Sequence, residues 1–276
     1  MFGEGELRKM SVRLDDESKV HYQLIFFDTP SQEERRVSIN EQIGKTIVFH
    51  FTGKIICKKC GKETKTSYNQ GFCYTCFKDA PESAECIIRP ELCRAHLGEG
   101  RDVEWEEKNH NQPHFVYLAA TDVVKVGVTR STQIPTRWID QGASEAIKLA
   151  ETPNRYLAGV IEVALKSEFT DKTNWRKMLR NEIDDSIDLE ETKWQLEELL
   201  PSDIAQYISE EDDITSIEYP VLEYPSKITS LNFDKTPIIK GKLLGIKGQY
   251  FLLDNGRVIN IRRHTGYQVS FKVENS

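Results

Sequence analysis

Four cysteines form two Cys-x-x-Cys pairs, Cys57/Cys60 and Cys73/Cys76, with twelve residues between the pairs. Structural zinc is bound by four such ligands at the corners of a tetrahedron, and this spacing is typical of a zinc ribbon. Gly61 follows the first pair and permits the tight turn that points backbone N–H groups at the sulfurs. Disulfides are the alternative, but the chain opens without a signal peptide, and cytoplasmic thiols stay reduced. We therefore expect one structural zinc ion here.

A second group of soft metal ligands follows the first within a short stretch. It consists of Cys86, Cys93 and His96. The last two are spaced as Cys-x-x-His, which suits a metal, and we expect His110 as the fourth ligand, with His114 or His50 as substitutes. The alternative is that both cysteines are small buried hydrophobic residues. A second zinc ion would clamp the ribbon to the segment that follows residue 110.

Charge is distributed unevenly along the chain, whose formal net charge is −7. Residues 182–223 hold fifteen acids and one base, whereas residues 235–272 hold eight bases and one acid. The ribbon carries lysines interleaved with aromatic residues, which suits phosphate contact combined with base stacking, so we predict a nucleic-acid partner, DNA or RNA. The predicted contacts are Lys58, Lys59, Lys240, Lys242, Lys247, Arg262 and Arg263. A solvated charged surface is the alternative.

Length and composition limit the class of protein. The 276 residues and 38% hydrophobic content allow two or three compact modules with ordinary cores. No apolar run approaches the length needed to cross a bilayer, so we expect a soluble, cytoplasmic protein. The patterns predict an α+β fold of several modules. These are a β-rich N-terminus at 1–53, a zinc-binding module at 54–114, an α/β domain at 115–181, an acidic helical connector at 182–233 and a small β-barrel at 234–276.

The central module should begin with a hairpin. Residues 115–119 and 123–128 are rich in β-branched and aromatic residues and are separated by a short turn. A helix that carries Arg137 should follow Pro135 and end at Gly142, because proline suits a first turn and glycine suits the residue after the last.

Further elements are expected toward the C-terminus. A longer helix should begin after Asn154, with Glu162 at the margin of its apolar stripe, and another should run from Thr173 to Leu179. The last residues read as short strands, and the pair Asn255-Gly256 is a strong hairpin signal. We expect them to form a small barrel, OB-like or SH3-like, with one basic face.

The segments 116–118, 126–130 and 136–138 together resemble the core of the GIY-YIG nuclease superfamily. They read Val-Tyr-Leu, Val-Gly-Val-Thr-Arg and Thr-Arg-Trp. Tyr117 matches the tyrosine of the first motif of that superfamily, and Gly127 matches the glycine of the second. The resemblance implies two short motif strands followed by helices that present the remaining site residues.

The same resemblance implies phosphodiester hydrolysis with one divalent metal, Mg²⁺ or Mn²⁺. Arg137 matches the helix arginine and would stabilise charge on the scissile phosphate, and Glu162 matches the metal-binding glutamate. Tyr117 would position the attacking water or take its proton. Lys125 stands where active members have a second tyrosine, so it is either a further phosphate contact or a sign of lost activity. Arg130 belongs to the same candidate catalytic set.

Most of the chain also resembles an uncharacterised bacterial family, a domain of unknown function with a zinc ribbon. Two functions follow as expectations. The first is a metal-dependent endonuclease to which the zinc and barrel modules deliver DNA or RNA. The second is a non-catalytic nucleic-acid-binding or protein-interaction module with a degenerate nuclease-like core. Convergence of Tyr117, Arg137 and Glu162 on one open cleft would favour the enzyme.

Overall fold

The computed structural model describes residues 3–166, 168, 174–184 and 186–274. The chain divides into two compact units. Unit 1 combines Met1–Lys78 with Glu218–Ser276, and unit 2 is Asp79–Ile217. The predicted N-terminal and C-terminal modules therefore share unit 1, and the predicted zinc-binding module is divided between the two units. Within the described ranges, no helix is both long and apolar enough to span a membrane.

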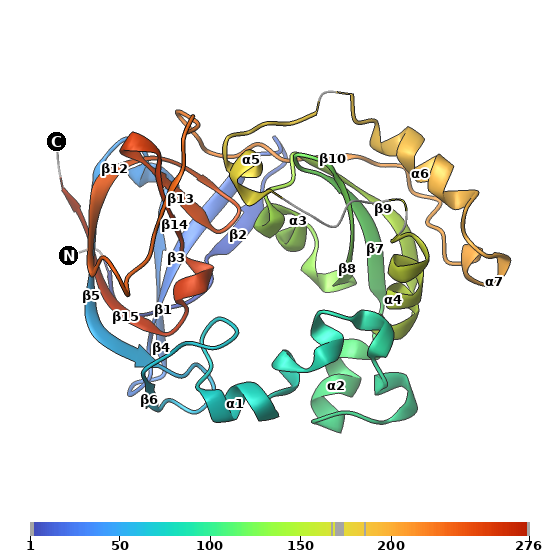
Figure 1. Ribbon diagram of the computed structural model, residues 1–276, viewed down its shortest axis with the longest axis horizontal. Helices are drawn as coiled ribbons and strands as arrows, with labels where there is room; N and C mark the ends of the chain where they lie inside the picture. Colours follow the sequence, from blue (N-terminus) through green and yellow to red (C-terminus); the bar gives the residue numbers. More distant parts are fainter. Residues whose placement is uncertain (1–2, 167, 169–173, 185, 275–276) are drawn as a thin grey trace. The chain divides into compact units, whose positions relative to one another are not determined.

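Unit 1 is built on one large sheet (Figure 1). The strand order is β11-β14-β13-β12-β5-β15-β1-β3-β2, with β4 beside β3 and β6 beside β5. The pairs are antiparallel except for β11 with β14. The elements are β1 (Gly3–Leu7), β2 (Ser11–Leu14), β3 (Val20–Asp28), β4 (Glu33–Ser38), β5 (Thr46–Ile56), β6 (Glu63–Thr64), α1 (Tyr74–Asp79), β11 (Thr229–Leu231), β12 (Ile238–Lys247), β13 (Tyr250–Leu253), β14 (Arg257–Asn260) and β15 (Tyr267–Glu274).

The expected separate C-terminal barrel is wrong, because the described strands form an open path that continues from the N-terminal strands into the C-terminal ones. β12 and β15 both pair with β5. The reason lies in the core: the buried ring of Phe49 lies 5.9 Å from that of Phe251 and 4.8 Å from that of Phe271, between ring centroids. Aromatic faces from both ends of the chain are thus buried together. The predicted hairpin at Asn255-Gly256 is confirmed, with β13 antiparallel to β14.

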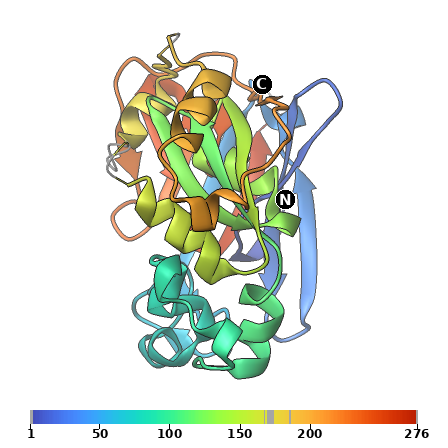
Figure 2. The same cartoon turned by 90° about the vertical axis from the view of Figure 1, so that its right-hand side faces the viewer.

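Unit 2 is a four-stranded sheet, β10-β9-β7-β8, with helices around it (Figures 1 and 2). Its strands are β7 (His114–Ala120), β8 (Val124–Arg130), β9 (Glu145–Thr152) and β10 (Thr215–Ser216). Its helices are α2 (Val103–His110), α3 (Thr136–Gln141), α4 (Arg155–Ala164), α5 (Trp175–Leu179), α6 (Leu189–Glu197) and α7 (Ser202–Ala205). The mixed α/β character that was expected is therefore present, and β7 and β8 form the predicted hairpin.

Every residue of β7 is buried because both faces of this central strand are covered. Val116 and Leu118 point into a core that includes Ile161 of α4 and Leu196 of α6. The two helices lie in front of the strands in Figure 2. On the opposite face, the ring of Tyr117 packs edge to face against the indole of Trp138, with 6.1 Å between centroids. Strand alternation thus separates the apolar core from the candidate catalytic face.

The predicted helix boundaries are confirmed where the sequence carries capping residues. Asn154 caps α4 by accepting a hydrogen bond from the N–H of Leu157 at 3.0 Å. Gly142 ends α3 in the left-handed conformation, with φ of 76°. The helix expected from Thr173 begins at Trp175 in the structure, and Thr173 itself lies outside the described residues.

Candidate metal and anion sites

The first cysteine cluster lies in unit 1. The sulfurs of Cys57, Cys60, Cys73 and Cys76 lie within 4.8 Å of one another, and those of Cys60 and Cys73 are 3.9 Å apart. Zinc–sulfur bonds of about 2.3 Å in a tetrahedron place the sulfurs about 3.8 Å from each other. The cluster could therefore hold zinc, as the spacing of the cysteines predicted.

The backbone around this cluster favours a thiolate at Cys57, the first cysteine after β5. Burial opposes ionisation of this thiol, but backbone N–H groups of Cys60, Cys73 and Lys59 directed at the sulfur outweigh it and lower the pKa to about 6. Gly61 makes the required turn, with φ of 69°, and its N–H donates to the carbonyl of Cys57 at 2.9 Å. The thiolate is the form that binds a metal.

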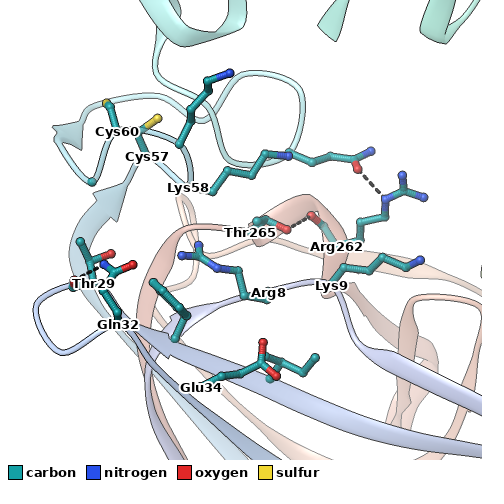
Figure 3. A pocket seen from close by; sticks show the side chains of 15 residues that line it. Arg8, Lys9, Thr29, Gln32, Glu34, Cys57, Lys58, Cys60, Arg262 and Thr265 are labelled. Carbon is teal, nitrogen blue, oxygen red and sulfur yellow. Dashed lines mark hydrogen bonds between the residues drawn. The ribbon is translucent and has the colours of Figure 1, made fainter. Parts of the chain in front are cut away.

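A cationic pocket of about 710 Å³ opens beside the cluster, and we call it the basic pocket (Figure 3). The loop that carries Lys58 forms one wall, and the strands with the turn at Arg262 form the other. Among the described residues that line it, five are basic and one, Glu34, is a carboxylate. The basic residues are Arg8, Lys9, Lys58, Lys59 and Arg262.

Arg8 is the most constrained cation of the basic pocket. Its guanidinium lies 4.6 Å from the centroid of the Phe27 ring, and its Nη2 atom lies 3.2 Å from the carboxylate of Glu6. Its Nη1 atom is buried and has no hydrogen-bond partner among the described residues. Burial lowers the pKa of this guanidinium, although nearby carboxylates oppose the shift. A buried charged donor that lacks a partner is costly unless a ligand satisfies it.

The sequence identified three residues of the basic pocket, Lys58, Lys59 and Arg262, and missed two. Arg8 and Lys9 are adjacent in a short connection between strands, far from the cysteines in the sequence, and no spacing signal marks them. Only the pairing of β1 with β3 and β15 brings them to the cysteine loop.

Four other residues that were predicted to contact nucleic acid lie elsewhere in unit 1. Lys240 pairs with Glu274 at 2.7 Å, Lys242 is exposed on β12, and Arg263 does not line the basic pocket. The assignment of Lys247 is corrected: it is 1% exposed, between the rings of Tyr219 and Tyr224, and burial lowers its pKa to about 8. A buried ammonium cannot reach a phosphate backbone.

The second cluster lies in unit 2 and consists of three buried residues, Cys86, Cys93 and His110, whose ligand atoms lie within 4.8 Å of one another. Nδ1 of His110 lies 3.6 Å from the sulfur of Cys93 and 4.0 Å from that of Cys86. A tetrahedral zinc ion would hold such atoms about 3.6 Å apart. This cluster could also hold zinc. Hydrogen bonding with Cys86, followed by that with His110, outweighs burial and lowers the pKa of Cys93 to about 4.

The other histidines considered as ligands are placed outside this group. His96 stacks on the ring of Tyr156 at 4.5 Å, and its buried Nδ1 has no hydrogen-bond partner in the described part of the chain. His114 directs its Nδ1 to the carbonyl of Gln112 at 2.7 Å. His50 is exposed on β5 of unit 1. Of the predicted Cys-x-x-His pair, Cys93 therefore belongs to the cluster and His96 does not.

Helix α4 packs closely against the segment that carries Cys86 and Cys93. Arg155, in its first turn, donates from Nε to the carbonyl of Cys86 and from Nη2 to that of Ile87, each at 2.9 Å. A Cβ atom on Gly159 would lie 2.2 Å from the backbone nitrogen of Glu91, so only glycine permits this approach.

A smaller cavity, of about 200 Å³, lies next to this segment, and we call it the arginine cavity. Arg130, Arg137 and Arg155 line it together with His110 and Asn109. Arg130 donates from Nη1 to the side-chain oxygen of Asn109. Burial lowers the pKa of both Arg130 and Arg155.

Three of the nuclease-like residues of unit 2 interact with one another. Tyr117 donates from its hydroxyl to Oε1 of Gln141 at 2.8 Å and interacts with the guanidinium of Arg137. Arg137 in turn interacts electrostatically with Tyr117, with Asp140 and with Glu162, which together raise its pKa. The residues that the nuclease resemblance singled out are therefore neighbours in space.

Two features of this group differ from an open catalytic cleft. Tyr117 is fully buried, and burial raises its pKa, so its hydroxyl is neutral and out of contact with solvent. Gly127 lies opposite Tyr117, and a Cβ atom there would be 2.5 Å from the tyrosine hydroxyl oxygen. Packing against Tyr117 is therefore sufficient to explain why this residue is glycine. Lys125 lies opposite Ala119 on the same hairpin, where its side chain is half-buried.

Comparison with known proteins gives a family and no functional assignment. No curated protein and no solved structure matches the chain. A family described as "Protein of unknown function (DUF2797)" matches residues 44–269, a span that includes all six cysteines. Because this match covers most of the sequence, the chain belongs to the DUF2797 family.

Proposed function

We propose that this protein binds nucleic acid through the basic pocket of unit 1, with zinc at the four-cysteine cluster holding one wall of that pocket in place. The observation that carries the proposal is the gathering of five basic side chains around about 710 Å³, with the buried Nη1 atom of Arg8 lacking a partner among the described residues. Phosphate groups supply the acceptor atoms and the negative charge that such a pocket requires.

The charge of the pocket remains positive when the metal is included. Five bases and one acid among the described lining residues sum to +4, and a zinc ion bound by four thiolates carries −2. The remaining positive charge attracts a polyanion. The cavity volume lies within the range of pockets that hold nucleotide-sized ligands.

Aromatic side chains in the segment that carries the four cysteines favour nucleic acid over a simple anion. Tyr68 stacks on Phe77 with 5.9 Å between ring centroids and contacts Tyr74 at 5.5 Å. Tyr74 is 58% exposed although it is a large aromatic residue. Exposed rings next to cations are the elements on which unpaired bases stack. Single-stranded DNA or RNA therefore fits this surface better than a duplex, whose bases are already stacked.

Binding can be measured by fluorescence anisotropy with labelled single-stranded RNA, single-stranded DNA and duplex DNA at several salt concentrations. The double variant Lys58→Gln/Arg262→Gln should bind roughly tenfold or more weakly, and the slope of log K against log salt should fall by about 2. The matched control, Lys240→Gln/Lys242→Gln, removes the same charge outside the basic pocket. Equal losses in the two double variants would show that binding depends on the net charge and not on the basic pocket, and would reject the proposal.

A second candidate function is phosphodiester hydrolysis in unit 2. The observation in its favour is the electrostatic interaction among Tyr117, Arg137 and Glu162. In this candidate Arg137 contacts the scissile phosphate and Glu162 holds Mg²⁺ or Mn²⁺. Within the described ranges, groups of three or more metal-ligating residues occur twice, and Glu162 belongs to neither. Because Tyr117 is buried as well, we rank hydrolysis below binding.

Hydrolysis is tested with the same nucleic acids in Mg²⁺, in Mn²⁺ and in chelator. Cleavage that disappears in both Arg137→Ala and Glu162→Ala would establish the second candidate. Binding without cleavage in the wild-type protein would reject it and leave the binding function intact.

A further inference from the structure

Glu106 is a buried carboxylate in the first turn of α2, one turn before His110. It is 3% exposed. Its Oε1 atom accepts a hydrogen bond from the backbone N–H of Arg101 at 2.9 Å, while the guanidinium of Arg101 turns away to the carbonyl of Ala80. No lysine or arginine forms an ion pair with Glu106 in the described part of the chain. Buried carboxylates are normally paired with a cation or bound to a metal.

The second oxygen of Glu106 faces the cysteine and histidine cluster. Its Oε2 lies 3.7 Å from Nδ1 of His110. The pKa of Cys86 is raised mainly by Cys93 and by burial, and the negative charge of Glu106 raises it further. The carboxylate therefore interacts electrostatically with that sulfur. Glu106 thus borders the three-ligand group on the side of His110.

Three acceptor atoms surround the same nitrogen of His110. They are the sulfurs of Cys93 and Cys86, at 3.6 and 4.0 Å, and Oε2 of Glu106, at 3.7 Å. A single N–H group makes one good hydrogen bond, and an N–H···O bond is about 2.9 Å long, so a proton on this nitrogen does not explain the arrangement. Ligands of one tetrahedral zinc ion are separated by about 3.3 to 3.8 Å, which matches the distances to Cys93 and Glu106 and is slightly shorter than the distance to Cys86.

We propose that Glu106 is the fourth ligand of a zinc site formed with Cys86, Cys93 and His110. Oε2 lies outside the group of ligand atoms that are all within 4.8 Å of one another, so the carboxylate completes the tetrahedron by turning from His110 toward the two sulfurs. Both thiols release their protons on binding, and His110 binds through neutral Nδ1. The inference does not depend on nucleic-acid binding, which concerns unit 1.

The surroundings fit the charge of this site. Zinc with two thiolates, one carboxylate and a neutral imidazole carries −1. The guanidinium of Arg155 interacts favourably with both Cys86 and Cys93 and donates to the backbone carbonyl of Cys86. It therefore supplies the compensating positive charge next to the ligands. Arg155 also lines the arginine cavity. A metal bound to Cys86 would therefore help to fix the position of this side chain in the cavity.

The loop before α2 is shaped around the carboxylate. A Cβ atom on Gly100 would lie 2.4 Å from Cδ of Glu106 and 2.5 Å from its Oε2, so any side chain at this position would displace the carboxylate. Asp102 caps α2 by accepting from the N–H of Trp105 at 3.0 Å, which fixes the start of the helix that carries both Glu106 and His110. Ligands four residues apart on one helix face the same side.

The test is metal content and metal affinity in purified full-length protein. Wild-type protein should contain two zinc ions per chain by elemental analysis, one for each cluster. Glu106→Gln should keep one zinc ion and lose the other to a mild chelator, with the affinity of the second site lowered by about 100-fold or more, and Glu106→Asp should be intermediate. In cobalt-substituted protein, Glu106→Gln should change the ligand-field bands while the thiolate charge-transfer bands persist.

Two control variants separate Glu106 from its neighbours. Glu107→Gln removes an exposed carboxylate of the same helix and should leave two zinc ions bound. His96→Asn removes the alternative fourth ligand, whose buried Nδ1 has no partner among the described residues, and should also leave two. Full zinc affinity in Glu106→Gln, or loss of the second zinc ion in His96→Asn alone, would overturn the proposal. The zinc ion retained at the four-cysteine cluster shows in each variant that unit 1 is folded.

Discussion

The two units each combine a cluster of cysteines with a cationic cavity, but the two arrangements differ. In unit 1, Cys60 is exposed, the cavity is about 710 Å³, and three of its five cations are lysines. In unit 2, all three clustered ligands are buried, the cavity is about 200 Å³, and its cations are arginines.

This difference has a physical meaning. Lysine is a flexible point charge, so the lysines of the basic pocket can adjust to anionic groups at different positions, as the proposed nucleic-acid ligand would require. Arginine has a planar group of donors, and Arg155 and Arg130 already use part of theirs on the carbonyl of Cys86 and on Asn109. The arginine cavity is therefore fixed in shape, and the chemistry of unit 1 is the more suitable for a long, variable polyanion.

The largest expected effect comes from removing each thiolate cluster in turn. Structural zinc contributes on the order of 10 kcal/mol to the folding of small modules, so Cys73→Ser/Cys76→Ser should unfold the loop that carries Lys58 and weaken nucleic-acid binding by about 100-fold. Cys86→Ser/Cys93→Ser should lose one zinc ion and leave binding within about threefold. Zinc content and anisotropy measure both. An equal loss of binding in the two variants would contradict the view that nucleic acid binds at unit 1.

The next effect tests whether Gly127 is required by packing in unit 2. Gly127→Ala places a Cβ against the hydroxyl of Tyr117 and should lower the free energy of unfolding by about 2 kcal/mol. In a Tyr117→Phe background, which removes the hydroxyl, the same change should cost less. Denaturant unfolding of the four proteins measures the coupling. A coupling energy near zero would show that the two residues do not meet.

A similar but smaller loss should follow Arg155→Lys. Lysine cannot donate to the carbonyls of Cys86 and Ile87 with the geometry of the guanidinium, so unit 2 should lose about 1.5 kcal/mol of stability. Arg180→Lys, at a solvent-screened ion pair with Glu182, is the matched control and should leave the free energy of unfolding nearly unchanged. If both variants lose the same amount of stability, Arg155 does not hold α4 to the segment that carries Cys86 and Cys93.

The smallest effect should be shared by the units. Burial lowers the pKa of His264 in unit 1 and of His114 in unit 2 to about 4, below the value of about 6.5 in an unfolded chain. The unfolded state therefore binds protons first, and the stability that each neutral ring contributes above pH 6.5 is lost as the pH falls toward 4. Each should contribute a loss of about 1 kcal/mol between pH 7.5 and 5.5.

Denaturant unfolding at these two pH values measures this dependence, and His264→Gln should flatten it. His264 accepts from the N–H of Phe233 at 3.3 Å and donates to the carbonyl of Asn260 at 2.8 Å, a pattern that needs the neutral ring. A slope unchanged in His264→Gln would assign the pH dependence to other groups, the thiolates included.

Local signals in the sequence predicted the local structure. The cysteine pairs predicted the four-sulfur cluster, Gly142 the end of α3, Asn154 the start of α4, and Asn255-Gly256 a hairpin. Each of these depends on residues that are near one another in the chain, whose backbone preferences act before any long-range contact forms.

Other features of the molecule depend on long-range pairing, for which the sequence carries no spacing. The union of both chain ends in one sheet, the arrival of Arg8 at the cysteine loop and the burial of Lys247 were decided by tertiary structure alone. The sequence by itself determined which side chains can bind a metal or a phosphate. Only the folded chain decided which of them share a cavity, because burial and strand pairing are properties of the whole unit.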